Sequence, residues 1–168
     1  MTVRAGRLLV VEGPEGAGKS TQVRRLASRL RDMGVRCATH REPGGTPLGD
    51  RTRQLLLEPT GPLTARAAAA LFLASRAELV ATVVRPALEN GTTVILDRFF
   101  LSTYAYQVHG RGLPEDEVRS ANAFSTAGLV PDLTIVLQLP FEEGLRRADT
   151  RGARDRMEAS GEEFHRRV

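Results

Sequence analysis

Eight residues near the N-terminus have the types and spacing of a loop that binds the phosphates of a nucleoside triphosphate. Residues 13–20 read Gly-Pro-Glu-Gly-Ala-Gly-Lys-Ser and fit the pattern G-x-x-x-x-G-K-[S/T]. Glycines let the backbone curl so that several amide N–H groups point at phosphate oxygens. We expect Lys19 to bridge the β- and γ-phosphates and Ser20 to ligate Mg²⁺. The alternative, a chance glycine-rich turn, is disfavoured by the strand pattern before the loop and the helical pattern after it.

The helix expected after this loop adds the positive partial charge of its N-terminal end to the phosphate site. Such a loop predicts ATP and Mg²⁺ as bound species and leaves open what is done with the triphosphate. The ATP-binding residues we expect are Gly13, Pro14, Glu15, Gly16, Ala17, Gly18, Lys19, Ser20 and Thr21.

The lysine content narrows the choice among proteins with phosphate loops. Of 24 Lys and Arg residues, Lys19 is the single lysine. A guanine-binding Asn-Lys-x-Asp motif needs a further lysine, and a partitioning ATPase usually has a second one near its loop. The composition therefore disfavours both classes and favours a small-molecule kinase. A compact ammonium also suits a tight backbone cradle better than a guanidinium does.

Composition excludes several other classes. The chain has 168 residues, 41% of them hydrophobic and 26% charged, which is typical of one globular domain. The single cysteine, Cys37, excludes an intrachain disulfide and a cysteine-rich zinc site. We see no apolar run near the ~20 residues of a bilayer span and no signal peptide, and we expect a cytoplasmic protein without a membrane partner. A net charge of +4 with 5% aromatic residues gives little support to a nucleic-acid-binding module, and we expect no nucleic-acid partner.

Apolar segments with strand character alternate with segments of helical periodicity. Strands are expected at 8–11, 35–39, 93–96 and 133–139. Helices are expected at 20–33, from Thr64 to Gly91 with a break or a new turn at Pro86, from Pro114, and from Phe141. This alternation predicts an α/β fold with a parallel sheet flanked by helices, in a single domain over 1–168. Parallel sheets place their sites at the carboxyl ends of the strands.

Four further segments complete a pattern. They are Thr-His-Arg-Glu-Pro-Gly-Gly-Thr at 39–46, Phe-Leu-Ala-Ser-Arg at 72–76, Asp-Arg-Phe at 97–99 with Ser-Thr-Tyr-Ala-Tyr-Gln at 102–107, and an arginine-rich stretch at 151–158. In this order the sequence closely resembles the thymidylate kinases, nucleoside monophosphate kinases that make dTDP from dTMP, over nearly the whole chain. The resemblance implies a three-layer P-loop NTPase fold with a lid, ATP, Mg²⁺ and dTMP as ligands, and a homodimer.

The resemblance assigns roles on the side of the acceptor base. Phe72 and Arg76 lie four residues apart and share a helical face, and they are implied to contact the thymine ring and a base carbonyl. The alternative is a core phenylalanine and a solvated arginine. Thr103 and Gln107 are implied to read the pyrimidine edge, and Tyr106 to pack on the sugar. For these three, the alternative is an amphipathic surface helix.

The resemblance also assigns residues to the phosphate and the metal ion. Arg53 and Arg98 are implied to hold the dTMP phosphate, since the planar guanidinium donates two parallel hydrogen bonds. A surface position is the alternative for Arg53. Asp97 follows the third strand and is expected, with Ser20, to hold Mg²⁺ or its water. Glu42 is implied to be an acid on the substrate or metal side.

The source of the transition-state arginine differs among members of this family. The phosphate loop here has Glu-Gly-Ala at 15–17 and no arginine, so the resemblance implies an arginine from a lid at about 147–158. Arg151 is the implied donor, and the catalytic set is then Lys19, Arg98 and Arg151. Asp149 stands where an arginine is common, which leaves Arg147 and Arg154 as alternatives.

The implied reaction is in-line transfer of the γ-phosphate from MgATP to dTMP. No general base is needed, because a phosphate monoester with a second pKa of about 6 is largely dianionic at neutral pH. Family members normally continue past the lid into one more strand and a terminal helix, so a C-terminally truncated domain is expected. A kinase for another nucleotide or deoxynucleoside, and an inactive nucleotide-binding fragment, are the alternative functions.

Overall fold

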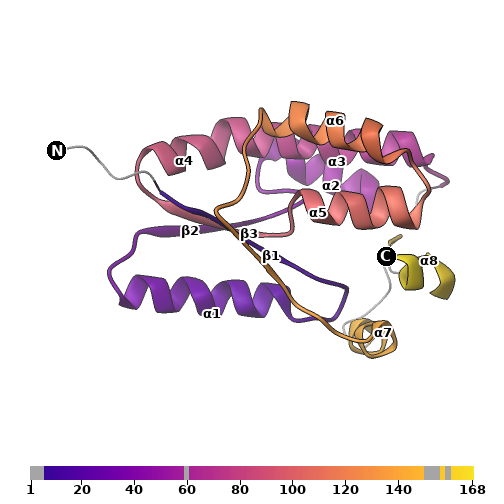
Figure 1. Ribbon diagram of the computed structural model, residues 1–168, viewed down its shortest axis with the longest axis horizontal. Helices are drawn as coiled ribbons and strands as arrows, with labels where there is room; N and C mark the ends of the chain where they lie inside the picture. The colour runs from indigo at the N-terminus through magenta and orange to yellow at the C-terminus, as the bar shows by residue number, and fades with distance from the viewer. Residues whose placement is uncertain (1–5, 59–60, 150–155, 158–159) are drawn as a thin grey trace.

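The computed structural model describes residues 6–58, 61–149, 156–157 and 160–168. Its centre is a four-stranded sheet of order β2-β3-β1-β4, in which every pairing is parallel (Figure 1). The strands are β1 (Leu8–Glu12), β2 (Cys37–Arg41), β3 (Thr93–Asp97) and β4 (Leu133–Val136). The carboxyl ends of β1, β2 and β3 are aligned, because Val11 and Arg41 both pair with Asp97.

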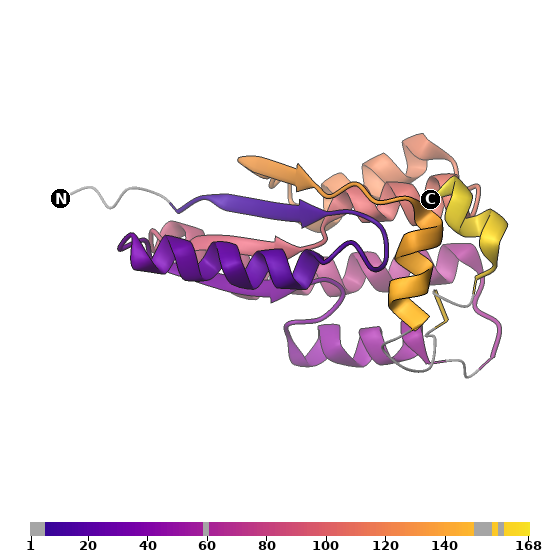
Figure 2. The ribbon, with the colours of Figure 1, turned by 90° about the horizontal axis from the view of Figure 1, so that it is seen from below.

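Helices cover both faces of the sheet (Figure 1). One face is covered by α1 (Lys19–Asp32), and the other by α3 (Ala65–Leu79), the π-helical segment η1 (Val80–Val84), α4 (Arg85–Glu89) and α6 (Glu115–Thr126). The remaining elements gather where the arrowheads of the strands point (Figure 2): α2 (Pro47–Leu57), α5 (Phe100–Thr103), the π-helical segment η2 (Tyr104–Gly110), α7 (Phe141–Asp149) and α8 (Glu162–Arg167). The three-layer α/β fold with a parallel sheet is thereby confirmed.

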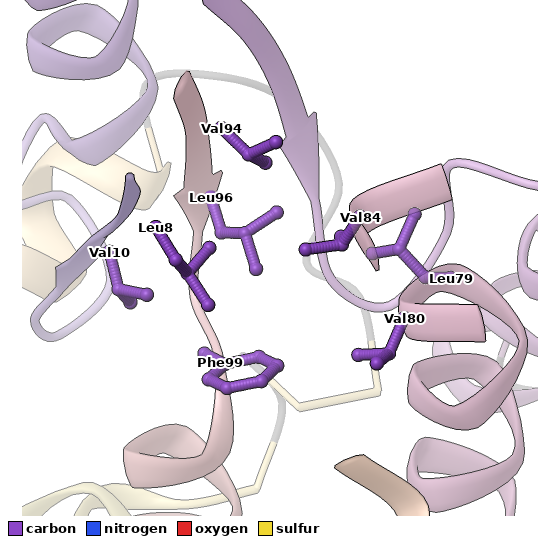
Figure 3. Close-up of a cluster of buried hydrophobic side chains, with 8 residues drawn as sticks. All are labelled: Leu8, Val10, Leu79, Val80, Val84, Val94, Leu96 and Phe99. Atoms are coloured by element: carbon purple, nitrogen blue, oxygen red, sulfur yellow. The ribbon is translucent and has the colours of Figure 1, made fainter. Parts of the chain in front are cut away.

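Alternate side chains of the strands supply two cores. Figure 3 shows the larger one, in which Leu8 and Leu96 pack against Leu79, Val84 and Phe99. Leu9, Val11 and Ile95, which alternate with these residues on the same strands, point to the α1 face and pack against that helix. Both central strands are therefore apolar on each face, as expected of a parallel sheet between helical layers.

The largest differences between the strand boundaries and the sequence expectations lie in β2 and β4. β2 begins at Cys37 rather than at residue 35, and β4 ends at Val136 rather than at 139. Helix α2 was not expected, although its start has two recognisable signals. The Thr46 hydroxyl accepts a hydrogen bond from the Gly49 amide, and Pro47 occupies the first turn, where a missing N–H costs nothing.

Pro86 begins a new turn without breaking the long helix. The backbone stays helical from Ala65 to Glu89, and Pro86 lies in the first turn of α4. The π-helical turn before it shifts the hydrogen bonding, with the Arg85 amide donating to the Val80 carbonyl. The second of the two alternatives for Pro86 is therefore correct.

The same helical run is long and apolar enough, by length and composition alone, to cross a bilayer. No apolar run near this length was expected from the sequence, in which Arg76 and Glu78 interrupt the apolar residues. In the structure, Leu79, Val80 and Val84 of this run are at most 1% exposed and belong to the larger core. One face of the run therefore packs against the sheet within the domain.

Candidate active site

The phosphate loop joins β1 to α1, as the motif predicts. Gly13, Gly16 and Gly18 all have positive φ angles, which side chains rarely adopt. A Cβ atom on Gly16 would also collide with the Gly144 carbonyl, because the backbone of α7 lies directly on the loop. Glycine at this position therefore has both a conformational and a packing cause.

Lys19 is folded back over its own loop. Its Nζ donates to the carbonyl oxygens of Gly13 and Pro14 at 2.9 and 2.7 Å, and the residue is 8% exposed. Burial, with the nearby charge of Arg98, lowers the pKa of Lys19 to about 8. An anionic phosphate at this position would raise this pKa again, because an opposite charge favours the ammonium form.

Two candidate metal ligands lie side by side. The Ser20 hydroxyl donates to Asp97 Oδ2 at 2.5 Å, which joins the start of α1 to the end of β3. A hydroxyl and a carboxylate are the oxygen ligands that suit Mg²⁺, which takes its other ligands from phosphates and water. Across the described ranges, no three His, Cys, Asp or Glu residues gather as a metal site. The donor set thus fits Mg²⁺ held jointly with a nucleotide.

Arg98 connects the phosphate loop with the segment after β3. Its backbone has a φ of 71°, a left-handed conformation that is uncommon for arginine. Nη1 donates to the Gly13 carbonyl at 3.2 Å and to the Ser102 hydroxyl at 2.9 Å. Nη2 donates to Glu15 Oε2 at 2.8 Å and to the Tyr106 hydroxyl at 3.2 Å. The guanidinium is thereby fixed from four sides.

Glu15 is the carboxylate that balances this guanidinium. It also accepts a hydrogen bond from the Tyr106 hydroxyl. Burial raises the pKa of Glu15, but Arg98, the Tyr106 hydrogen bond and Lys19 outweigh burial and hold the pKa below its ordinary value. The phosphate loop therefore carries a negative charge that faces two cations.

Arg76 lies in a second, fully buried polar cluster. Its Nε and Nη2 bind Glu42 at 2.7 and 2.6 Å, and its Nη1 donates to Thr103 at 2.9 Å and to Asn122 at 2.5 Å. The guanidinium carbon also stands 5.2 Å from the centre of the Phe99 ring. Burial raises the pKa of Glu42 despite the opposing charge of Arg76. Both side chains of the ion pair are at most 4% exposed.

One cavity opens beside Arg76 and a second beside Arg98, and the two cavities share part of their walls. The acceptor cavity, as we call the one beside Arg76, is lined by Glu15, Glu42, Pro43, Arg53, Leu57, Phe72, Arg76, Arg98, Phe99, Ser102, Thr103, Tyr106, Gln107 and Met157. The phosphate cavity is lined by Glu15, Gly16, Gly18, Lys19, Ser20, Thr21, Arg41, Glu42, Arg53, Asp97 and Arg98. Four residues belong to both walls: Glu15, Glu42, Arg53 and Arg98.

All eight residues expected on the acceptor side line the acceptor cavity. Gln107 is 0% exposed, and neither its amide oxygen nor its amide nitrogen has a hydrogen-bond partner among the residues that the structure describes. A buried amide of this kind is costly unless a ligand pairs with it. An amide offers both a donor and an acceptor, which suits the edge of a pyrimidine base.

Two of the three candidate lid arginines, Arg151 and Arg154, lie outside the described residues. Arg147 lies on α7, where its Nε donates to Glu143 at 2.7 Å and its side chain is 50% exposed. The choice among the three stays a prediction. At the far end of the lid, Met157 is buried and reaches the wall of the acceptor cavity.

Sequence reasoning missed several residues that form or support the site. Glu12, Ser102 and Asn122 hold the two arginines or their backbone through hydrogen bonds. Met157 packs with Tyr106 and with Phe164 of α8. Ser102 lies within the motif 97–107, Met157 lies within the arginine-rich stretch 151–158, and Glu12 directly precedes the phosphate loop. Asn122 has no local signal.

The fold and the loop between β1 and α1 define a P-loop protein, in which a second cavity adjoins the cavity at the phosphate loop. The chain matches the family model of thymidylate kinase over residues 11–168.

Curated relatives agree with this match. The thymidylate kinase of Deinococcus radiodurans is 49% identical over 163 residues, which cover 97% of this chain and 79% of the relative. That of Pseudomonas putida is 48% identical over 161 residues, which cover 95% and 77%. That of Carboxydothermus hydrogenoformans is 45% identical over 163 residues, which cover 97% and 80%. The chain belongs to the thymidylate kinase family of nucleoside monophosphate kinases, as the motif order predicted.

Proposed function

We propose that this chain transfers the γ-phosphate of ATP to dTMP and so makes dTDP for dTTP biosynthesis. The observation that carries the proposal is the shared wall of the two cavities, at Glu15, Glu42, Arg53 and Arg98. A triphosphate on the phosphate loop and a monophosphate in the acceptor cavity would meet at these residues. Membership of the thymidylate kinase family supports dTMP as the acceptor.

The acceptor cavity offers separate contacts for the two ends of a pyrimidine nucleotide. Phe72 lines it with an aromatic ring, and the unpartnered amide of Gln107 is available to the edge of the base. Arg76 and Thr103 fix each other beside that amide, so their orientation is set before a base arrives. The monophosphate would point to Arg98 and Arg53, and Tyr106 would pack on the sugar between the two ends.

Catalysis would consist of positioning and charge neutralisation. Lys19 would exchange its two loop carbonyls for the β- and γ-phosphates, and Arg98 would hold the acceptor phosphate in line with the γ-phosphorus. Ser20 and Asp97 would hold Mg²⁺, which neutralises phosphate charge when bound. The dTMP phosphate is already dianionic at neutral pH, so no side chain has to remove a proton.

The lid would complete this site. We propose Arg151 as the donor that stabilises the transferring phosphoryl group, with Arg147 and Arg154 as the alternatives. Helix α7, whose last residues belong to the lid, lies on the phosphate loop where Gly144 meets Gly16, so the chain enters the lid directly from the donor site. Closure over the nucleotides would exclude water and limit wasteful hydrolysis of ATP.

The remaining parts of the proposal concern the setting of the reaction. We propose one kinase domain that acts in the cytoplasm as a homodimer, with dTMP and ATP as its partners and without binding to nucleic acid or a membrane.

A panel of acceptors tests the function. ADP release is measured with ATP, Mg²⁺ and each of dTMP, dUMP, dCMP, dAMP, dGMP and thymidine, and again with EDTA in excess of Mg²⁺. The proposal predicts turnover that is fastest with dTMP and lost with EDTA. Fast turnover with another acceptor, or none with any, contradicts it.

A further inference from the structure

The carboxylate of Glu12 lies at the end of β1, immediately before the phosphate loop, and is 3% exposed. Its Oε1 accepts hydrogen bonds from the backbone amides of Phe99 and Ser102 at 2.8 and 3.2 Å. Its Oε2 accepts one from the Ser102 hydroxyl at 2.6 Å. A single carboxylate thus holds the chain at both ends of the turn that follows Arg98.

The Ser102 hydroxyl continues this contact to the guanidinium of Arg98. It accepts a hydrogen bond from Arg98 Nη1 at 2.9 Å while it donates to Glu12. Because a hydroxyl has one proton, donating it to Glu12 leaves the oxygen lone pairs free to face Arg98. The negative charge of Glu12 therefore sets the direction of the contact with Arg98.

The backbone of Arg98 needs such support. Its left-handed φ of 71° is unfavourable for a residue with a Cβ and persists only where the surroundings enforce it. The Phe99 amide that Glu12 holds is the peptide group directly after Arg98. On the other side, the Arg98 amide donates to the Val11 carbonyl of β1 at 3.0 Å. The residues around Glu12 therefore hold Arg98 from both sides.

We propose that Glu12 and Ser102 are positioning residues that aim the Arg98 guanidinium at the acceptor phosphate. The proposal rests on the proposed function, because it takes Arg98 as the phosphate ligand. Glu12 lines neither cavity, so it would act on substrate only through Arg98 and Ser102. Ser102 lines the acceptor cavity, and its hydroxyl is already engaged by Glu12 and Arg98.

Comparing dTMP with thymidine separates this role from a merely structural one. The two ligands differ only in the phosphate that Arg98 would contact. Loss of positioning lowers the affinity for dTMP and leaves that for thymidine unchanged, so the ratio of the two affinities falls. General damage to the cavity lowers both affinities together and keeps the ratio.

The experiment measures both dissociation constants by calorimetry for the wild type, Ser102→Ala, Ser102→Thr and Glu12→Gln. Ser102→Ala is expected to lower the ratio about tenfold, the size expected for one hydrogen bond to a charged group. Ser102→Thr keeps the hydroxyl and is expected to restore the ratio. Ser125→Ala removes another buried hydroxyl, which donates to a carbonyl of its own helix, and is the matched control with an unchanged ratio.

A double variant tests whether the effect passes through Arg98. In the background of Arg98→Ala, adding Ser102→Ala is expected to lower the ratio no further. An unchanged ratio in Ser102→Ala, or equal losses for dTMP and thymidine, overturns the positioning role. If Glu12→Gln fails to fold, Ser102→Ala and its threonine rescue still decide the matter.

The wild type separates failure of this inference from failure of the proposed function. A wild type that turns over dTMP and prefers it to thymidine supports the function, whatever the variants do. A wild type without turnover or without that preference overturns the function, and the positioning role falls with it.

Discussion

Three arginines line the acceptor cavity, and the chain holds two of them, Arg76 and Arg98, in different ways. Arg76 is 2% exposed, and its guanidinium is bound by Glu42, Thr103 and Asn122. The Arg98 side chain is 17% exposed and stands on the wall that both cavities share. The first belongs to a closed polar cluster at the end proposed for the base, and the second to an open junction proposed for the phosphates.

This contrast would let one site combine rigid recognition of a base with phosphoryl transfer. A base is neutral, so a side chain that contacts it can be fully paired within the protein and still offer a fixed surface. A phosphate carries charge, so its ligands must keep a cation that is accessible to it. Arg98 shares its carboxylate partner, Glu15, with Tyr106, and the opposite charge of a phosphate can take over part of that contact.

The largest effect is expected from Lys19→Met, which removes one cation from the phosphate cavity and leaves the base end unchanged. Without Lys19 the charge that develops on the transferring phosphoryl group is poorly stabilised, and kcat is expected to fall by about 10³-fold or more. The affinity for thymidine, which needs only the base end, is expected to stay unchanged. Steady-state kinetics and calorimetry measure the two quantities, and a parallel loss of thymidine binding would mean that the two ends are not separate.

A loss of stability is expected from Arg76→Met. This change leaves the buried Glu42 without its partner, and the free energy of unfolding is expected to fall by about 3–5 kcal/mol. The double variant Arg76→Met/Glu42→Gln removes both charges and is expected to recover part of this loss. Urea unfolding followed by circular dichroism provides the comparison, and equal stability of single and double variants would show that the pair is not coupled.

Arg98→Met is expected to lower activity strongly and stability only slightly. Its partner Glu15 keeps the Tyr106 hydrogen bond and some contact with water, so the free energy of unfolding is expected to fall by only about 1 kcal/mol. The value of kcat/KM for dTMP is expected to fall by about 100-fold, because a charged contact with the reacting phosphate is lost. A stability loss as large as that of Arg76→Met would erase the distinction between the two arginines.

The smallest effect concerns pH. The pKa of Lys19 is lowered by burial to about 8 in the folded protein, against 10.5 for a lysine side chain in water. Between these values the unfolded chain binds more protons at this site than the folded one, so stability rises with pH. Between pH 8 and 10.5, the free energy of unfolding of the wild type is expected to gain roughly 2 kcal/mol relative to Lys19→Met. Urea titrations across this range measure it, and identical pH profiles would contradict the buried ammonium.

The sequence predicted the ligand-facing residues of the site better than the residues that hold them. Phe72 and Arg76 share a helical face, and Thr103 and Gln107 follow a strand, but the resemblance to thymidylate kinases was needed to place them in one site. Periodicity alone favours a core phenylalanine and a solvated arginine. Asn122 reaches Arg76 across 46 positions of the chain. Such contacts depend on how helices pack, which no local pattern encodes.

The same limit applies to the fold. The alternation of strands and helices predicted the parallel sheet, because short apolar runs at 8–11, 93–96 and 133–139 are separated by segments of helical periodicity. Helix α2 was missed, since its amphipathic pattern is short and follows a Pro-Gly-Gly turn directly. The roles of Arg151 and of the other candidate lid arginines stay predictions.

The central claim is that the two cavities are the donor and acceptor halves of one transfer site. The most direct measurement is the competition of a single molecule, adenosine joined to thymidine through five phosphates, against ATP and against dTMP on the wild type. We expect the joined molecule to displace both ATP and dTMP and to bind more tightly than either of them. Displacement of only one of them, with no gain in affinity, would contradict a site in which the two phosphate chains meet at Arg98.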